Sequence, residues 1–358
     1  MLVYITYFII LAFLAIRYEF GKQESWPILI AVILGLGFLA GLRHPDIERD
    51  YQNYLFSFDM IYEDKNPLFL AVYEPGFFLI VFTIKSIIKY NYGVAIMLVY
   101  AFCSVIVKTL SIKKLAINPY LVMLFYFSHF FFLHEMTQIR IGLATAFFFA
   151  AIPLLLANKN KSYIAFILLA TLFHYTAILY LFLLLLKRDR INRVLFGGIL
   201  ISAIAFAFLK LPLIGILSNF NSNEFSSKID NYAYAAEFAS EKINVLNTVT
   251  IFNILTCLYL LIAVSVDGFE KDKRLTLFLK CNIISVFLLA VLSSIPSIAF
   301  RISDLFGVLS MFTFSYLARY LPFGKYNIFF TIGIAAVFFY FFALNSDLIK
   351  PYRMVDFR

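Results

Sequence analysis

Ionisable side chains outside the basic turns of this apolar chain gather beside or within its hydrophobic stretches. They are Arg43, Asp46, Arg49, Asp50, Glu74, Glu135, Arg140, His174, Arg301 and Asp304. A charge within or next to a membrane span is costly, and it usually faces a protein interior or a water-filled cavity. We therefore interpret this set of residues as a hypothesis for a binding or catalytic site.

Two arginines of this set stand near predicted helix starts. Arg140 lies near the start of TQIRIGLATAFFFAA, and Arg301 follows the helix-breaking SSIPSIAF. A guanidinium group binds phosphate oxygens in a bidentate manner, and a helix N-terminus adds to that attraction. The pattern favours a lipid-linked phosphate or diphosphate as the ligand. The alternative is that each arginine only extends to the lipid headgroups.

A histidine and two carboxylates compete for the role of general base. His174 lies in the apolar run LLATLFHYTAIL, where an imidazole is either a structural group or a base that accepts the proton of a sugar hydroxyl. Glu74 precedes the Pro-Gly break of YEPGFF, so it is either a base or a helix-start carboxylate that interacts with free amides. Asp50 is likewise a cap or a base.

The elements that position these residues are predicted to be membrane helices. The chain has 358 residues, is 63% hydrophobic and 14% charged, and has a mean hydropathy of +0.89, which is far more apolar than a soluble domain of this length. We predict an all-α, polytopic bundle of roughly 11–13 transmembrane helices in a single integral membrane domain, residues 1–358. Spans are expected near residues 2–16, 26–42, 92–112, 119–134, 138–157, 162–186, 194–218, 247–266, 275–293, 302–320 and 326–345.

Two segments do not fit one regular span each. Residues 74–90 fit a full span, a re-entrant piece or an interfacial helix, and residues 162–186 fit one tilted helix or two short helices that meet near His174. Irregular backbone at membrane depth is tolerated only where it is buried in protein or lines a wet cavity. Both segments therefore point to a cavity nearby.

The distribution of charge predicts the orientation of the chain. Basic residues that mark cytoplasmic turns are Lys108, Lys113, Lys114, Lys159, Lys161, Lys187, Arg188, Arg190, Arg193, Lys271, Lys273 and Arg274. The acidic outer loops are expected at about residues 43–73 and 219–246, with the N-terminus outside. The net charge of +9 is thus explained by cytoplasmic loops, and we expect no nucleic-acid partner. The three cysteines have no metal-site or disulfide spacing.

Five blocks of the sequence resemble, in this order, those of the EpsG-like branch of the Wzy polysaccharide polymerases. The likeness runs from about residue 41 to 305. Where members of that branch often have Arg-Gln-Gly, this chain has Arg140-Ile141-Gly142 and lacks the glutamine. The blocks are GLRHPDIERDYQNYLF, YEPGFFLI, QIRIGLATAFFF, LATLFHYTA and AFRISDLF.

The resemblance implies a metal-independent glycosyltransferase of the bacterial inner membrane, without a cofactor and with the GT-C-like architecture of multi-span, lipid-donor enzymes. Such a polymerase transfers a growing glycan from undecaprenyl diphosphate onto a lipid-linked oligosaccharide repeat at the periplasmic face, in O-antigen, capsule or exopolysaccharide synthesis. A chain-length regulator of the Wzz type is the expected protein partner, and membrane lipid surrounds the site.

This chemistry assigns expected roles to the residues. Arg140, Arg301 and then Arg43 are the predicted diphosphate ligands, because cleavage of a sugar–diphosphate bond builds negative charge on the leaving group. His174 is the predicted base; Asp50 and Glu74 are alternative bases or acceptor-orienting groups. The alternatives are an O-antigen ligase or another lipid-donor transferase. A lipid-linked sugar flippase is disfavoured, because the polar set lies at one membrane edge and no internal repeat is evident.

Overall fold

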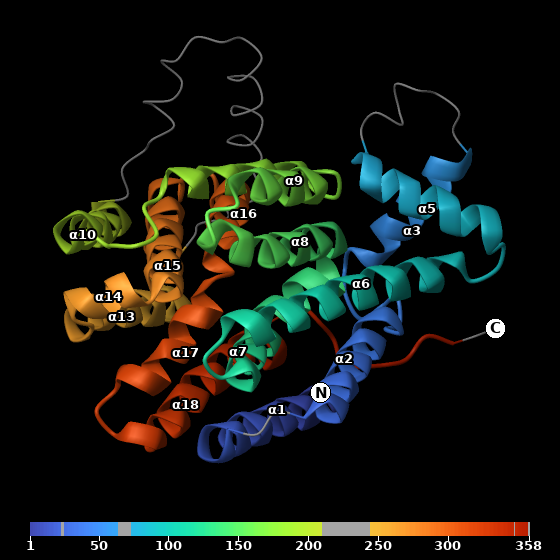
Figure 1. Cartoon of the computed structure of the whole chain (residues 1–358). Coiled ribbons are helices and arrows are strands. Elements are labelled where there is room, and N and C mark those ends of the chain that lie inside the picture. The colour runs from blue at the N-terminus through green and yellow to red at the C-terminus, as the bar shows by residue number, and fades with distance from the viewer. Residues whose placement is uncertain (23–24, 64–72, 210–243, 347, 357–358) are drawn as a thin grey trace, which may run out of the picture. The chain divides into compact units, whose positions relative to one another are not determined.

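The computed structural model describes residues 1–22, 25–63, 73–209, 244–346 and 348–356, and these residues are helical almost throughout (Figure 1). The chain divides into two compact units, one formed by Met1–Leu185 with Leu321–Arg358 and the other by Leu186–Tyr320. Within the described residues the extended structure is an isolated bridge between Arg43 and Met354. The predicted all-α class is confirmed.

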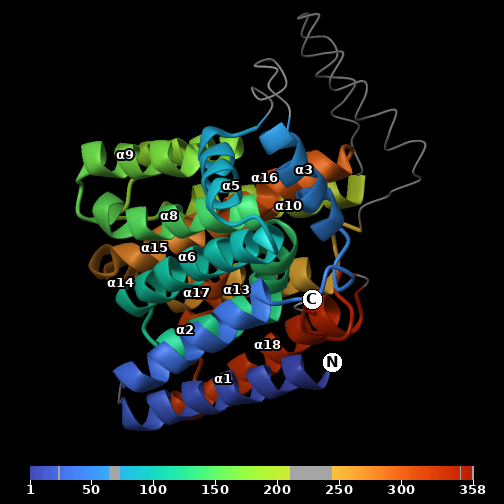
Figure 2. The same ribbon diagram turned by 90° about the vertical axis from the view of Figure 1, so that its right-hand side faces the viewer.

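The first unit contains the helices that surround the Glu74, Arg140 and His174 side chains. Helix α6 packs against both α2 and α8, α8 packs against α9, and α1 lies along α18 (Figure 2). Its helices are α1 (Leu2–Gly21), α2 (Trp26–Gly41), α3 (Tyr51–Glu63), α5 (Pro75–Ile87), α6 (Tyr92–Leu115), α7 (Pro119–Phe125), η1 (Tyr126–Thr137), α8 (Ile139–Leu156), α9 (Asn160–Thr171), η2 (Tyr175–Leu185), η3 (Gly324–Tyr326), α18 (Asn327–Phe339) and η4 (Tyr340–Leu344).

The second unit is built around one long helix, α15, which packs against α10, α13, α16 and α17. The Lys280 ammonium group of α15 donates hydrogen bonds to the carbonyl oxygens of Lys187 and Arg190, and it thereby fixes the turn that leads into α10. The helices of this unit are α10 (Arg193–Leu209), α13 (Thr248–Ala263), α14 (Val266–Lys271), α15 (Lys273–Val291), α16 (Pro296–Gly307) and α17 (Ser310–Tyr320).

Among the described residues, five helices are long and apolar enough to cross a membrane, and the pair α16 and α17, bent by 48°, makes up to six. Five shorter apolar helices accompany them: Trp26–Gly41, Pro75–Ile87, Tyr175–Leu185, Arg193–Leu209 and Thr248–Ala263. The chain is therefore a multi-pass membrane protein, as predicted. The number of roughly 11–13 spans stays a prediction, because most of the shorter helices fall below the roughly 17 residues that are needed to cross the bilayer.

Of the two segments that the sequence left open, one is a broken helix and the other holds a single short helix. Residues 162–186 form two helices, α9 and η2, with His174 in the break between them. Helix α5 has only 13 residues and begins at Pro75, directly after Glu74. Lys108 was wrongly assigned to a cytoplasmic turn, because α6 continues to Leu115 and buries it. The single-domain prediction and the outer-loop predictions stay open, and residues 64–72 and 219–243 of those loops lie outside the described residues.

Candidate functional site

Three of the predicted site residues come together in the first unit. One carboxylate oxygen of Glu74 lies 2.7 Å from Nη1 of Arg140, and the other lies 3.2 Å from Nδ1 of His174. The Glu74 side chain is 6% exposed, whereas those of Arg140 and His174 are 34% and 23% exposed. The Glu74 carboxylate is thus buried beneath its two partners, whereas the Arg140 and His174 side chains each keep part of their surface exposed.

A glycine allows the two backbone segments of this site to approach each other. The Gly76 N–H group donates a hydrogen bond of 2.7 Å to the Leu172 carbonyl oxygen at the end of α9. A Cβ atom on Gly76 would lie 2.8 Å from that same oxygen. The Tyr175 hydroxyl also donates to the Tyr73 carbonyl oxygen, at 3.4 Å. The start of α5 is therefore anchored to the break that carries the histidine.

Aromatic side chains form the wall around the Arg140 guanidinium group. Its carbon atom lies 5.2 Å from the ring centre of Phe77 and 6.0 Å from that of Tyr54. Within the described part of the chain, the buried Tyr100 hydroxyl has no hydrogen-bond partner, and its ring packs against Phe77. The buried cluster behind this wall joins α3, α5, α6 and α8: Tyr51, Tyr54, Phe58, Ile61, Phe77, Val81, Ile96, Met97, Tyr100, Ile139, Leu143 and Ala146.

The electrostatics of Glu74 define the protonation pattern of the site. Burial by itself raises the pKa of this carboxyl group, but the hydrogen bond with His174 and the charge of Arg140 outweigh burial and hold the pKa below its ordinary value. An ionised carboxylate can only accept a hydrogen bond, so Nδ1 of His174 carries the hydrogen that it donates to Glu74, and Nε2 of the neutral ring keeps its lone pair. The arrangement can therefore accept a proton at Nε2.

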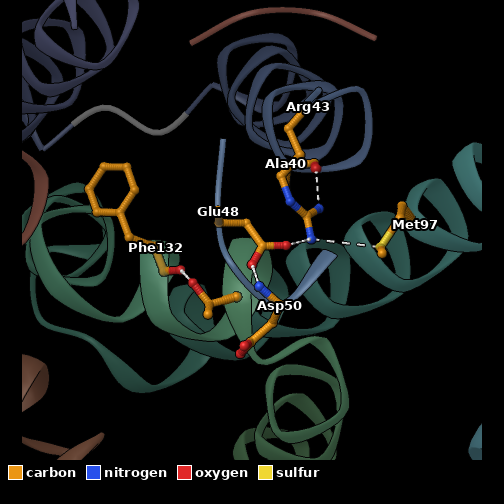
Figure 3. Close-up of polar contacts among 7 residues, drawn as sticks. Ala40, Arg43, Glu48, Asp50, Met97 and Phe132 are labelled. Carbon is orange, nitrogen blue, oxygen red and sulfur yellow. Dashed lines mark hydrogen bonds and ion pairs between the residues drawn. The ribbon is translucent and has the colours of Figure 1, made fainter. Parts of the chain in front are cut away.

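Arg43, the third predicted diphosphate ligand, is fully buried. Its Nη1 atom donates to the Ala40 carbonyl oxygen at 2.6 Å, and its Nη2 atom lies 3.3 Å from Glu48 and 3.6 Å from the Met97 sulfur (Figure 3). The guanidinium group is thus turned into the protein. We therefore do not include Arg43 among the proposed ligand-binding groups.

Asp50 lies next to this buried pair, at the start of α3. Its N–H group donates to Glu48 at 2.6 Å (Figure 3). Its carbonyl oxygen accepts from the N–H group of Tyr54. Asp50 therefore lies one helical turn before Tyr54, whose aromatic ring borders the Arg140 guanidinium group. Its predicted role as an alternative base stays a prediction.

Arg301 and Asp304 belong to the second unit. Both lie on α16, which begins at Pro296, and the Arg301 side chain is exposed on this helix. The predicted diphosphate-binding role of Arg301 stays a prediction.

Two charged residues whose connection the sequence analysis missed form a buried ion pair in the first unit. Lys108 on α6 bonds to Glu135 on η1, and the Tyr126 hydroxyl donates to the same carboxylate at 2.7 Å. Both charged side chains are at most 2% exposed. A basic residue inside the predicted span 92–112 and an acidic residue directly after the next predicted span, 119–134, were the signal that could have revealed this pair. Among the described residues no cluster of three or more His, Cys, Asp or Glu side chains suits a metal ion.

The fold and this site define a class: a multi-pass, all-α membrane protein with arginine, glutamate and histidine held together at helix breaks. The family model described as EpsG family matches residues 26–354, and the chain belongs to this family. The resemblance found in the sequence blocks is thereby confirmed. At the family level the chain is a polysaccharide-polymerase-like, glycosyltransferase-like membrane protein. No curated protein and no solved structure matches it.

Proposed function

We propose that this protein is a Wzy-type polymerase of a bacterial inner membrane. It transfers a growing glycan from undecaprenyl diphosphate onto a lipid-linked oligosaccharide repeat at the periplasmic face. The observation that supports this proposal best is the Glu74 carboxylate, which contacts both Arg140 and His174. This arrangement combines a cation for the leaving group with a group that accepts a proton.

The proposed step is a substitution at the anomeric carbon of the donor glycan. The acceptor hydroxyl oxygen forms a bond to this carbon while the bond from the carbon to the diphosphate oxygen breaks, and the electron pair of that bond leaves with the diphosphate. The hydroxyl proton passes to Nε2 of His174. Glu74, bonded to Nδ1, orients the imidazole ring and stabilises the imidazolium ion that forms.

Arg140 is the proposed partner of the leaving diphosphate. A guanidinium group has five N–H donors, and Glu74 engages Nη1. Tyr54 forms a further side-chain hydrogen bond with Arg140, and the exposed face of the guanidinium group is proposed to donate to phosphate oxygens, whose charge grows as the bond breaks. Arg301 is kept as a second proposed phosphate ligand, on the grounds of its exposure in the middle of α16.

The proposal extends to the surroundings of the enzyme. The donor, the acceptor and the membrane lipid are the proposed partners, with a Wzz-type regulator of chain length. The step proceeds with the side chains named above, without a cofactor or metal ion, as the resemblance implies.

Deletion of the protein in its native host tests the proposal. We expect single repeats on the surface anchor in place of long chains, seen by gel analysis of surface glycan. Loss of all attached glycan would instead indicate a ligase, and undisplayed units inside the cell would indicate a flippase. Arg140→Ala should reproduce the deletion while the protein stays in the membrane, and Arg17→Ala, at an exposed arginine of α1, is the matched control. Long chains from Arg140→Ala at the wild-type level would refute the phosphate role.

A further inference from the structure

The C-terminal segment of the chain is bound to the loop that precedes α3. We name residues 350–355 the C-terminal strap. The His44 N–H group donates to the Arg353 carbonyl oxygen, and the Val355 N–H group donates to the Leu42 carbonyl oxygen, each at 2.9 Å. The Lys350 N–H group donates to Ile47 at 2.8 Å. Segments some 300 residues apart are thereby held in antiparallel register, with Arg43 opposite Met354.

Arg43 connects this paired loop to three helices. Its guanidinium group bonds to Ala40 in the last turn of α2, contacts Met97 on α6 and lies 5.1 Å from the ring centre of Tyr51 at the start of α3. A fully buried cation is expensive unless it is paired. Its partner here is Glu48, which is also buried.

Glu48 transmits this anchoring to the start of α3. One of its oxygens accepts from Arg43, and the other accepts from the Asp50 N–H group (Figure 3). The residue after Asp50 begins α3, and one turn later Tyr54 borders the Arg140 guanidinium group and packs 6.3 Å from Phe77, ring centre to ring centre. Arg43 and Glu48 thus set where α3 starts.

We propose that Arg43 and Glu48, closed by the C-terminal strap, are positioning residues for the transfer reaction: they hold the start of α3 so that Asp50 and Tyr54 stand against the Arg140 site. This inference rests on the proposed function. It assigns to Arg43 a role that differs from ligand binding, because the guanidinium group is fully buried and all its contacts described above are with protein groups.

The pairing of strap and loop is tested first, without reference to activity. In a chain whose three cysteines are replaced by alanine, Leu42→Cys and Val355→Cys are introduced together, since opposite residues of an antiparallel pair lie within reach of a disulfide. Mild oxidation in membranes should give an intramolecular disulfide, detected by mass spectrometry. The two single-cysteine variants are the controls. Absence of the disulfide in the double variant would overturn the proposed strap.

The positioning role is tested by kinetics with purified full-length protein and lipid-linked repeats. Arg43→Ala should lower kcat by about 10²-fold, since small displacements of catalytic groups have effects of that size, and KM should change much less. Arg43→Lys keeps the charge and should recover part of kcat. A chain that ends at Ile349 should behave like Arg43→Ala, whereas a chain that ends at Asp356 keeps the strap and should behave like the wild type.

The two proposals fail in different ways. Arg140→Ala is assayed in parallel, and kcat is normalised to correctly folded protein from size-exclusion chromatography. An unchanged kcat in Arg43→Ala, together with loss of activity in Arg140→Ala, overturns the positioning role alone. Full activity in Arg140→Ala overturns the proposed site. If Arg43→Ala does not fold, Arg43→Lys decides: a lowered kcat with unchanged KM supports positioning, and a wild-type kcat refutes it.

Discussion

The Glu74 carboxylate lies between the Arg140 guanidinium group and the His174 imidazole ring, 2.7 Å from Nη1 and 3.2 Å from Nδ1. A carboxylate with both oxygens engaged is poorly placed to take a proton from a substrate. In the proposed reaction Glu74 instead links the group that accepts the proton of the acceptor hydroxyl, His174, to the group that binds the leaving diphosphate, Arg140. Its predicted role as an alternative base is therefore the least favoured of the three.

The charge of Glu74 should be essential for transfer. Glu74→Gln preserves the shape of the side chain but removes the stabilisation of the imidazolium ion, so kcat should fall about 10²–10⁴-fold. The assay is polymer formation from lipid-linked repeats by purified protein. His174→Ala in the Glu74→Gln background should then cause little further loss, since the two residues act as a unit. Independent, additive losses would contradict this coupling.

The close approach at Gly76 should tolerate no side chain. In Gly76→Ala the new Cβ atom would meet the Leu172 carbonyl oxygen at 2.8 Å, and the hydrogen bond from residue 76 would be strained. We expect a loss of about 1–3 kcal/mol in the free energy of unfolding, together with shorter polymer. Gly333→Ala in α18 is the matched control, since a Cβ there meets nothing within 4 Å. Equal stability of the two variants would show that the contact is unimportant.

The buried ion pair of α6 and η1 should depend on both partners. Lys108→Met leaves the Glu135 carboxylate buried without its cation, which should cost about 3–5 kcal/mol in the free energy of unfolding. Adding Glu135→Gln should restore much of that loss. Unfolding of the single and double variants in detergent gives the coupling energy by a double-mutant cycle. A coupling energy near zero would mean that the two charges do not stabilise each other.

The pH dependence of stability should carry a contribution from Glu48. Burial, opposed by Arg43, raises the pKa of this carboxyl group from 4.5 to about 7. The folded protein therefore binds the proton more tightly than the unfolded chain does. The contribution of this proton on Glu48 to the free energy of unfolding is fully present below pH 4.5 and is lost as the pH rises through about 7. The free energy of unfolding, wild type minus Glu48→Gln, should fall across this interval; a flat difference would contradict the assignment.

The predicted orientation can be tested apart from the reaction. With the exposed Cys103 replaced by alanine, Gln52→Cys on α3 should react with an impermeant thiol reagent in intact cells, and Asn192→Cys should react only after the membrane is opened. Both side chains are exposed, so access to the reagent depends on the side of the membrane. The opposite labelling pattern would place the site on the cytoplasmic face. Ser226, another expected outer position, lies outside the described residues.

The fold class and part of the candidate site could be predicted from the sequence, because apolar stretches and the polar residues that interrupt them are both visible there. Glu74 stands before a Pro-Gly break, and a polar His174 inside an apolar run marks a place where regular helix is costly, so both pointed to irregular backbone near a site. The bridging position of Glu74 could not be predicted, because it depends on the contact of Gly76 with Leu172. The burial of Arg43 could not be predicted either, because its side chain contacts Ala40, Met97 and Tyr51 from three different helices and its backbone pairs with a strap some 300 residues later.

The π-helix η1 has a consequence for natural variation in this stretch. Its 12 residues lead directly through Gln138 into α8, and Gly142 packs so tightly that a Cβ atom would lie 2.3 Å from the His134 carbonyl oxygen. Removing one residue from η1 would change the rotation of the side chains before the deletion relative to those after it. Glu135 could then no longer contact Lys108 while Arg140, which follows η1, kept its contact with Glu74. Homologous chains should therefore vary in residue type here far more readily than in length.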